Sequence, residues 1–263
     1  MYLLFLIIDD TVNSIDIPTI NEDAGVMMSY NTSYGQFCPL AMAADFLCQR
    51  WTMLVLRELL LGSQSFNDIS RGVARMSRTL LSKRLKELEG RGLVTKQIRS
   101  NQRDTQYKLT TSGKSLGSVV FGMADWSQEW LHTEPSLENI DADHLFWSLR
   151  RSARPHSNLP SPFVVHIFLS DQPKNKQNAW LLFEDNEVEL CINDHGFEVD
   201  VQVEAISKSL TKVYLGWSSF QKEIASKEIT LHGETQYTAL IDQWLGKSRL
   251  AKIKKQPENL RVS

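Results

Sequence analysis

The chain has 263 residues, of which 42% are hydrophobic and 23% charged, and its formal net charge is −2. This composition excludes a disordered chain, which would have fewer apolar residues and a larger charge imbalance, and the length allows two ordinary domains. Three widely spaced cysteines fit neither a disulfide framework nor a zinc pattern, and neither a glycine-rich phosphate loop nor an HExxH motif occurs. We therefore expect a protein that is not an enzyme and that uses no metal and no cofactor.

The first ten residues, MYLLFLIIDD, contain a short apolar run that no Lys or Arg precedes. A signal peptide starts with positive charge, and eight apolar residues are too few to span a bilayer. We expect a cytoplasmic protein in which residues 1–34, with five acidic and no basic residues, form an acidic extension. Alternatively, the start codon is assigned too far upstream, because Met27 and Met28 stand just before the regular pattern begins.

Positive charge gathers in one part of the chain. Residues 35–132 carry fourteen basic and eight acidic residues, whereas residues 133–263 carry fifteen basic and eighteen acidic ones. Within residues 71–108, eleven basic residues stand against three acidic ones. Such a patch favours a polyanionic partner, usually nucleic acid, and the alternative is a solvated helix face.

Apolar periodicity predicts helices over residues 39–49, 51–61 and 65–73. Ser65 is a possible cap of the third helix, and Ser77 can cap a fourth that ends near Gly90. In this fourth helix Leu81, Leu85 and Leu88 share one face, so cations and hydroxyls point outward.

Two alternating runs, residues 93–99 and 106–110, predict a hairpin with a polar turn between them. A helix over residues 111–131 follows, with Leu116, Val119, Val120, Met123, Trp126 and Trp130 on its apolar side. This order is that of a winged helix-turn-helix, in which the exposed helix fits the major groove of double-stranded DNA. Arg99 and Arg103 are placed to contact DNA from the hairpin.

A series of short motifs runs in order along residues 35–132. They are Cys38-Pro39-Leu40, Arg50-Trp51-Thr52, Leu56-Arg57-Glu58-Leu59, Phe66-Asn67-Asp68-Ile69, Ser77-Arg78-Thr79-Leu80-Leu81-Ser82, Leu85-Lys86-Glu87-Leu88, Gly92-Leu93-Val94, Tyr107-Lys108-Leu109-Thr110 and Gly113. Through these motifs, residues 35–132 resemble the HxlR-type branch of the MarR-like transcriptional regulators. The resemblance implies a homodimer on two operator half-sites, with the terminal helices in the dimer interface. It also implies that Ser77, Arg78, Thr79, Ser82, Lys83 and Arg84 enter the groove.

Cys38 has two interpretations. Some regulators of this type sense oxidants or electrophiles through a cysteine at the corresponding place, and a helix N-terminus favours the thiolate that such chemistry needs. The alternative is a packing residue without a sensing role. Cys48, on the apolar face of its helix, is expected in the core.

Residues 133–143 are expected to be a linker or a short lead-in, and an amphipathic helix begins at His144. Strand-like runs follow at residues 162–170, 179–185, 187–193 and 196–204, with Val199, Val201 and Val203 facing inward. Two helices around a short strand near residue 230 complete an α+β domain with a mainly antiparallel sheet. Residues 247–263 are expected to be a frayed basic tail.

Residues 144–246 resemble a sterol-carrier-protein-type domain, through the alternating Val199–Val203 strand, Leu215-Gly216, the run Glu228-Ile229-Thr230-Leu231-His232-Gly233 and the closing helix Leu240–Leu245. The resemblance implies an apolar cavity for a fatty or sterol-like ligand. A domain without a pocket that serves dimerisation is the alternative. From the alternation of apolar and polar residues, we expect the following residues to line the cavity: Val165, Ile167, Leu182, Leu190, Trp217, Leu240 and Trp244.

Three hypotheses follow. The first is a dimeric DNA-binding transcriptional regulator modulated by a small apolar ligand in its second domain. The second is a redox- or electrophile-responsive regulator that acts through Cys38, with a structural second domain. The third is a lipid-binding protein whose basic segment docks on anionic membranes; it is disfavoured because membrane-lying helices expose large apolar residues, whereas these leucines are needed for the core. We therefore expect DNA, a second subunit and a small ligand as partners, and no membrane.

Overall fold

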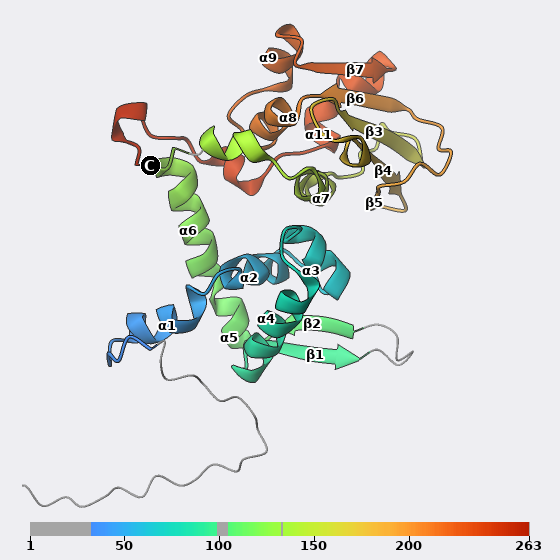
Figure 1. Ribbon diagram of the computed structural model, residues 1–263. Coiled ribbons are helices and arrows are strands. Elements are labelled where there is room, and N and C mark those ends of the chain that lie inside the picture. Colours follow the sequence, from blue (N-terminus) through green and yellow to red (C-terminus); the bar gives the residue numbers. More distant parts are fainter. Residues whose placement is uncertain (1–32, 99–104, 133, 263) are drawn as a thin grey trace, which may run out of the picture.

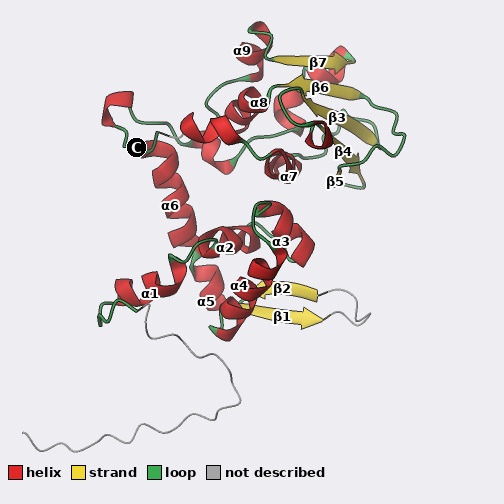
Figure 2. Cartoon of the chain, in the orientation of Figure 1, coloured by secondary structure: helices red, strands yellow, loops and turns green. Residues whose placement is uncertain are grey.

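The computed structural model describes residues 33–98, 105–132 and 134–262. The chain forms a mainly helical first half that ends with the long helix α6, and an α+β second half (Figure 1). The strands form a two-stranded hairpin in the first half and a five-stranded sheet in the second (Figure 2).

The first half has the order predicted for a winged helix-turn-helix. The predicted helix over residues 111–131 is interrupted at Leu116, which ends one helix and starts the next. The elements are α1 (Pro39–Leu47), α2 (Thr52–Leu60), α3 (Phe66–Gly72), α4 (Arg78–Gly90), β1 (Val94–Ile98), β2 (Thr105–Leu109), α5 (Thr111–Ser115) and α6 (Gly117–Trp130).

Serine caps and a leucine stripe fix α3 and α4. The Ser65 hydroxyl accepts a hydrogen bond from the backbone N–H of Asp68, and that of Ser77 accepts one from Leu80. Each satisfies a donor that the first helical turn leaves free, so both predicted caps are confirmed. Leu81, Leu85 and Leu88 are at most 2% exposed and belong to the core of this half, as their spacing predicts.

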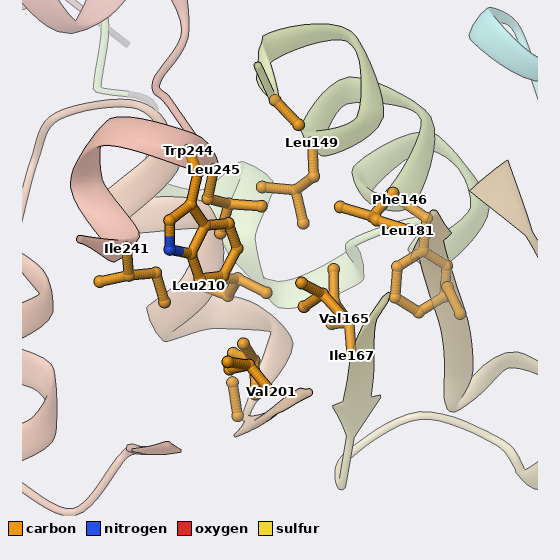
Figure 3. Close-up of a cluster of buried hydrophobic side chains, with 14 of the residues drawn as sticks. Phe146, Leu149, Val165, Ile167, Leu181, Val201, Leu210, Ile241, Trp244 and Leu245 are labelled. Atoms are coloured by element: carbon orange, nitrogen blue, oxygen red, sulfur yellow. The ribbon is translucent and has the colours of Figure 1, made fainter. Parts of the chain in front are cut away.

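The second half is an α+β layer. Its sheet has the strand order β5-β4-β3-β6-β7, in which β3 and β6 are parallel and every other neighbouring pair is antiparallel. Helices α7, α8 and α11 contribute apolar side chains to the core on one face of the sheet (Figure 3). The elements are α7 (Ala142–Ser152), β3 (Phe163–Leu169), β4 (Asn178–Glu184), β5 (Glu187–Cys191), β6 (Val201–Ala205), α8 (Ser207–Tyr214), α9 (Phe220–Ala225), β7 (Ile229–Gly233), α10 (Thr235–Thr238) and α11 (Ile241–Trp244), with short 3-10 turns η2 (Glu134–Asn139), η3 (Lys174–Lys176), η4 (Arg249–Lys252) and η5 (Glu258–Leu260).

Two sequence predictions for this half are wrong, the inward-facing Val199 and the frayed tail. Strand β6 begins only at Val201, so Val199 lies outside the strand and is 38% exposed. The expected linker contains η2 and buries Leu137. The expected frayed tail packs along α6, where the backbone N–H of Val262 donates to the Trp130 carbonyl at 2.8 Å.

Candidate nucleic-acid interface

Helix α4 presents a polar face to solvent while its leucines pack inward. Because a helix places every third or fourth residue on one side, burial of the leucine stripe forces the remaining side chains outward. The exposed residues at its start and along this face are Ser77, Arg78, Thr79, Ser82 and Lys83. Hydroxyls and cations are the groups that hydrogen-bond base edges and phosphates.

Arg78 is exposed but held in one direction by α3. Its Nη2 donates to the Asn67 side-chain oxygen at 3.0 Å, and its guanidinium lies 4.7 Å from the centre of the Phe66 ring. Such contacts reduce the conformational freedom that the side chain would lose on binding a partner.

Arg84 does not lie on this exposed face. Its side chain is only 14% exposed and forms an ion pair with Glu87. Its Nη1 donates to the Gln49 side-chain oxygen at 2.6 Å and its Nε to the Arg50 carbonyl at 3.3 Å, so it ties α4 to the turn between α1 and α2. We therefore leave it out of the interface. The two hairpin residues proposed as DNA contacts, Arg99 and Arg103, lie outside the described residues.

The cysteines differ in environment. Cys38 is exposed just before α1, where the backbone N–H groups of Ala41 and Leu40 lower the pKa of its thiol. Burial, and then the charge of Glu189, raise the pKa of Cys191. Cys48 is exposed, so its expected place in the core is wrong, because it lies in the turn after α1 rather than on the buried face.

The predicted cavity residues do not gather around one space. Val165, Ile167 and Trp244 are fully buried among core side chains (Figure 3). Leu182 lies on the opposite face of the sheet, since its β4 neighbours Leu181 and Phe183 point into the core. Leu190 and Leu240 pack against the edge of the core, and Trp217 lies beneath the Lys255 ammonium.

A match to the GxSxG pattern, residues 113–117, has the wrong context for a catalytic serine. That motif needs a sharp strand-to-helix turn that exposes the serine. Ser115 instead ends α5, and its hydroxyl donates to the Ser112 carbonyl at 2.7 Å. Gly113 is needed for packing, because a Cβ at this position would lie 2.1 Å from the Leu93 carbonyl oxygen.

Sequence reasoning missed a buried ionic cluster between the two halves. Glu58 of α2 has no exposed surface, and it accepts hydrogen bonds from Arg57 at 2.8 and 3.0 Å. From α7, Arg151 forms an ion pair with the same carboxylate, and the Trp147 indole N–H donates to it at 3.3 Å. A glutamate in the apolar run WTMLVLRELLL was the available signal, because an acidic residue is rarely buried without partners.

His144 of α7 lies beside this cluster. Burial, and then the positive charge of Arg57, lower the pKa of its imidazole to about 4 from 6.5. The unfolded chain therefore takes up a proton first as the pH falls, so stability is lost between about pH 6.5 and pH 4. Over this pH range, the unfolding free energy of the wild type is expected to fall by up to about 3 kcal/mol more than that of His144→Gln, which has no imidazole to protonate. Urea denaturation of both proteins at several pH values measures the difference. Parallel pH curves for the two proteins would contradict a neutral buried imidazole.

Among the described residues, no helix combines the length and apolar character needed to cross a membrane. Within the same ranges, His, Cys, Asp and Glu side chains do not gather into a group that could hold a metal ion.

The fold and the exposed face of α4 define a winged helix-turn-helix protein. Residues 46–135 match the HxlR-like helix-turn-helix family. The chain is 37% identical over 104 residues to the uncharacterized HTH-type transcriptional regulator YvaP of Bacillus subtilis, covering 39% of this chain and 94% of that protein. The chain belongs to the HxlR-like helix-turn-helix family.

Two further similarities cover comparable shares of the chain. The uncharacterized HTH-type transcriptional regulator sll1512 of Synechocystis is 29% identical over 101 residues, covering 38% of this chain and 75% of that protein. The structure of the reduced transcriptional regulator YodB from B. subtilis is 30% identical and covers 35% of this chain and 93% of that one, with a TM-score of 0.32.

Proposed function

We propose that the protein is a dimeric, cytoplasmic, DNA-binding transcriptional regulator whose α4 enters the major groove. The observation that carries the proposal is the exposed face of α4, with Ser77, Arg78, Thr79, Ser82 and Lys83 outward and the leucine stripe buried. Family membership supports it, since the relatives are named as transcriptional regulators. The buried leucines also disfavour a helix lying on a membrane, which would expose them.

Selection of duplexes from a random pool tests the proposal. The full-length protein is expected to enrich one short, roughly palindromic sequence, because a two-fold symmetric dimer reads two half-sites. Affinity for the selected duplex should fall linearly with the logarithm of salt concentration as phosphate contacts release counterions. Recovery of unrelated sequences after repeated rounds would reject sequence-specific regulation.

An exposed apolar surface on α1 and α6 supports the dimer. Val119, Met123 and Trp126 recur at helical spacing on α6 and are 48, 55 and 51% exposed, and Leu40 on α1 is 76% exposed. A surface of this kind, not covered by the docked tail, is typical of a subunit interface.

Trp126→Glu is therefore expected to convert the dimer into a monomer, because a charge replaces a large apolar side chain at the proposed interface. Sedimentation velocity measures the change. Ile192→Glu, at a 65% exposed apolar residue of the second half, is the matched control and should remain dimeric. Equal sedimentation of the two variants would place the interface elsewhere.

The proposal includes modulation of DNA binding by a small apolar ligand in the second half. The α+β arrangement, with helices on one face of a mainly antiparallel sheet, supports the sterol-carrier-type resemblance from which this role was inferred. Because Val165, Ile167 and Trp244 are fully buried in this core, such a ligand would bind outside its centre.

A second candidate function is redox or electrophile sensing through Cys38. The observation that favours it is an exposed thiol whose pKa is lowered by the first N–H groups of α1. Iodoacetamide at pH 7 is expected to label Cys38 several-fold faster than Cys191, as read by peptide mass spectrometry. Cys38→Ser should bind the selected duplex normally under reducing conditions and lose any response to diamide; an unchanged diamide response would remove Cys38 as the sensor.

A further inference from the structure

A pocket of about 360 Å³ opens between the two halves of the chain. Helix α2 and the turn after α3 form one side, through Leu54, Val73 and Ala74. The segment from η2 to α7, together with α8, forms the other, through Leu145 and Leu215. A mostly apolar pocket of this size at the boundary of two domains is where small molecules bind in many proteins.

Charge around the pocket is unevenly distributed. Arg57 and Arg75 line it, against the single carboxylate of Asp141. Glu58 lies behind the wall and is already bonded by Arg57 and by Arg151, so the surroundings keep an excess of positive charge.

Both lining arginines retain hydrogen-bonding capacity. Arg57 uses Nε and Nη2 for Glu58 and for the Gly72 carbonyl, and Arg75 uses Nε and Nη2 for Asp141 and Asn139. Among the described residues, neither Nη1 donates a hydrogen bond. A carboxylate is the acceptor that suits a guanidinium best.

Apart from Asp141, which is paired with Arg75, the polar groups on the other side of the pocket carry no charge at neutral pH. Burial raises the pKa of the Tyr214 phenol, and His144 is neutral because its pKa is about 4. The Thr211 hydroxyl is buried without a hydrogen-bond partner among the described residues, although its residue lines the pocket. An unpaired buried hydroxyl costs free energy that a ligand oxygen would recover.

We propose that this interdomain pocket is the effector site and takes an apolar monocarboxylic acid, with the carboxylate toward Arg57 and Arg75 and the chain or ring among the apolar walls. The proposal rests on the regulatory function proposed above and moves the ligand from the interior of the second half to its boundary with the DNA-binding half.

The location couples the pocket to α4. The turn after α3 lines the pocket with Val73, Ala74 and Arg75, and it ends two residues before Ser77, the cap of α4. On the other side, Arg75 donates a hydrogen bond of 3.1 Å to Asp141 at the start of α7. A ligand that prefers one spacing of the two halves therefore shifts the position of α4 relative to its partner helix in the dimer.

Octanoate and octan-1-ol are the probes, because they share an alkyl chain and differ in charge. Calorimetry with the full-length protein is expected to show one octanoate per subunit and weaker binding of octan-1-ol. Ala74→Trp, which places an indole in the pocket from an exposed position, should weaken octanoate binding at least about tenfold, whereas Ala225→Trp, exposed on α9, should not. Arg75→Gln should reduce the preference for octanoate over octan-1-ol about tenfold, as expected for one charge-assisted contact.

Two outcomes overturn the proposal. One is absence of octanoate binding, and the other is equal binding by the Ala74→Trp and Ala225→Trp proteins. A second experiment tests regulation with the selected duplex. Octanoate should change the affinity of the wild-type protein for this duplex and leave the affinity of the Ala74→Trp protein unchanged. Failure to select a duplex would reject the proposed function but leave the calorimetric result standing, so the two failures are distinguishable.

Discussion

Lys83→Glu is expected to weaken binding to the selected duplex at least about a hundredfold. Removing a groove contact costs about 1–3 kcal/mol, and a symmetric dimer loses the contact twice. The new carboxylate also faces the phosphates, which adds repulsion. Because Lys83 is exposed and outside the leucine stripe, the fold should be unaffected. Fluorescence anisotropy at fixed salt measures the affinity.

Lys208→Glu is the matched control, since Lys208 is an exposed lysine on helix α8 of the second half. The Lys208→Glu substitution changes the net charge of the protein by the same amount as Lys83→Glu. Both variants therefore share any change in the long-range attraction between the protein and DNA. An equal loss of affinity in both variants would mean that net charge, and not the α4 face, carries the binding.

Glu58→Ala is expected to lower the free energy of unfolding by about 3–5 kcal/mol, because it removes one partner of a buried ion pair and leaves Arg57 and Arg151 without their counter-charge. The Trp147 indole N–H loses its acceptor at the same time. Since the carboxylate joins α2 to α7, the two halves should also unfold less cooperatively. Denaturation followed by circular dichroism measures both effects.

Asp125→Ala offers the comparison. Asp125 of α6 pairs with Arg249 of η4 at 2.6 and 2.9 Å and so also connects distant segments, but both side chains are about 40% exposed. Water competes for such a pair, and its loss should cost at most about 1 kcal/mol. If Glu58→Ala were equally mild, the buried cluster would not hold the halves together.

Local patterns predict the DNA-binding half well. The cap at Ser77 and the leucine stripe of α4 depend on contacts within a few residues, so their spacing alone places the exposed face. The alternation of Val201 and Val203 likewise predicts which side of β6 is buried, because side chains along a strand alternate between faces.

Long-range contacts decide what the sequence does not predict. Arg84 looks like its exposed neighbours, but it is drawn to Gln49 and Arg50, about thirty-five positions earlier. The tail appears polar and free, yet it docks on α6 through backbone hydrogen bonds that leave no periodic signal. The interdomain pocket is formed by segments up to about 160 residues apart, so helical and strand periodicities carry no information on it.

Hydroxyl-radical footprinting of the selected duplex tests the central claim most directly. A dimer that places α4 of each subunit in the major groove should protect two patches about one helical turn, or 10–10.5 base pairs, apart, related by two-fold symmetry. At the same fractional occupancy of the duplex, the Lys83→Glu protein should protect the centre of both patches less strongly than the wild type. Protection of a single patch, or uniform protection that does not depend on sequence, would contradict a dimeric winged helix-turn-helix that reads DNA through α4.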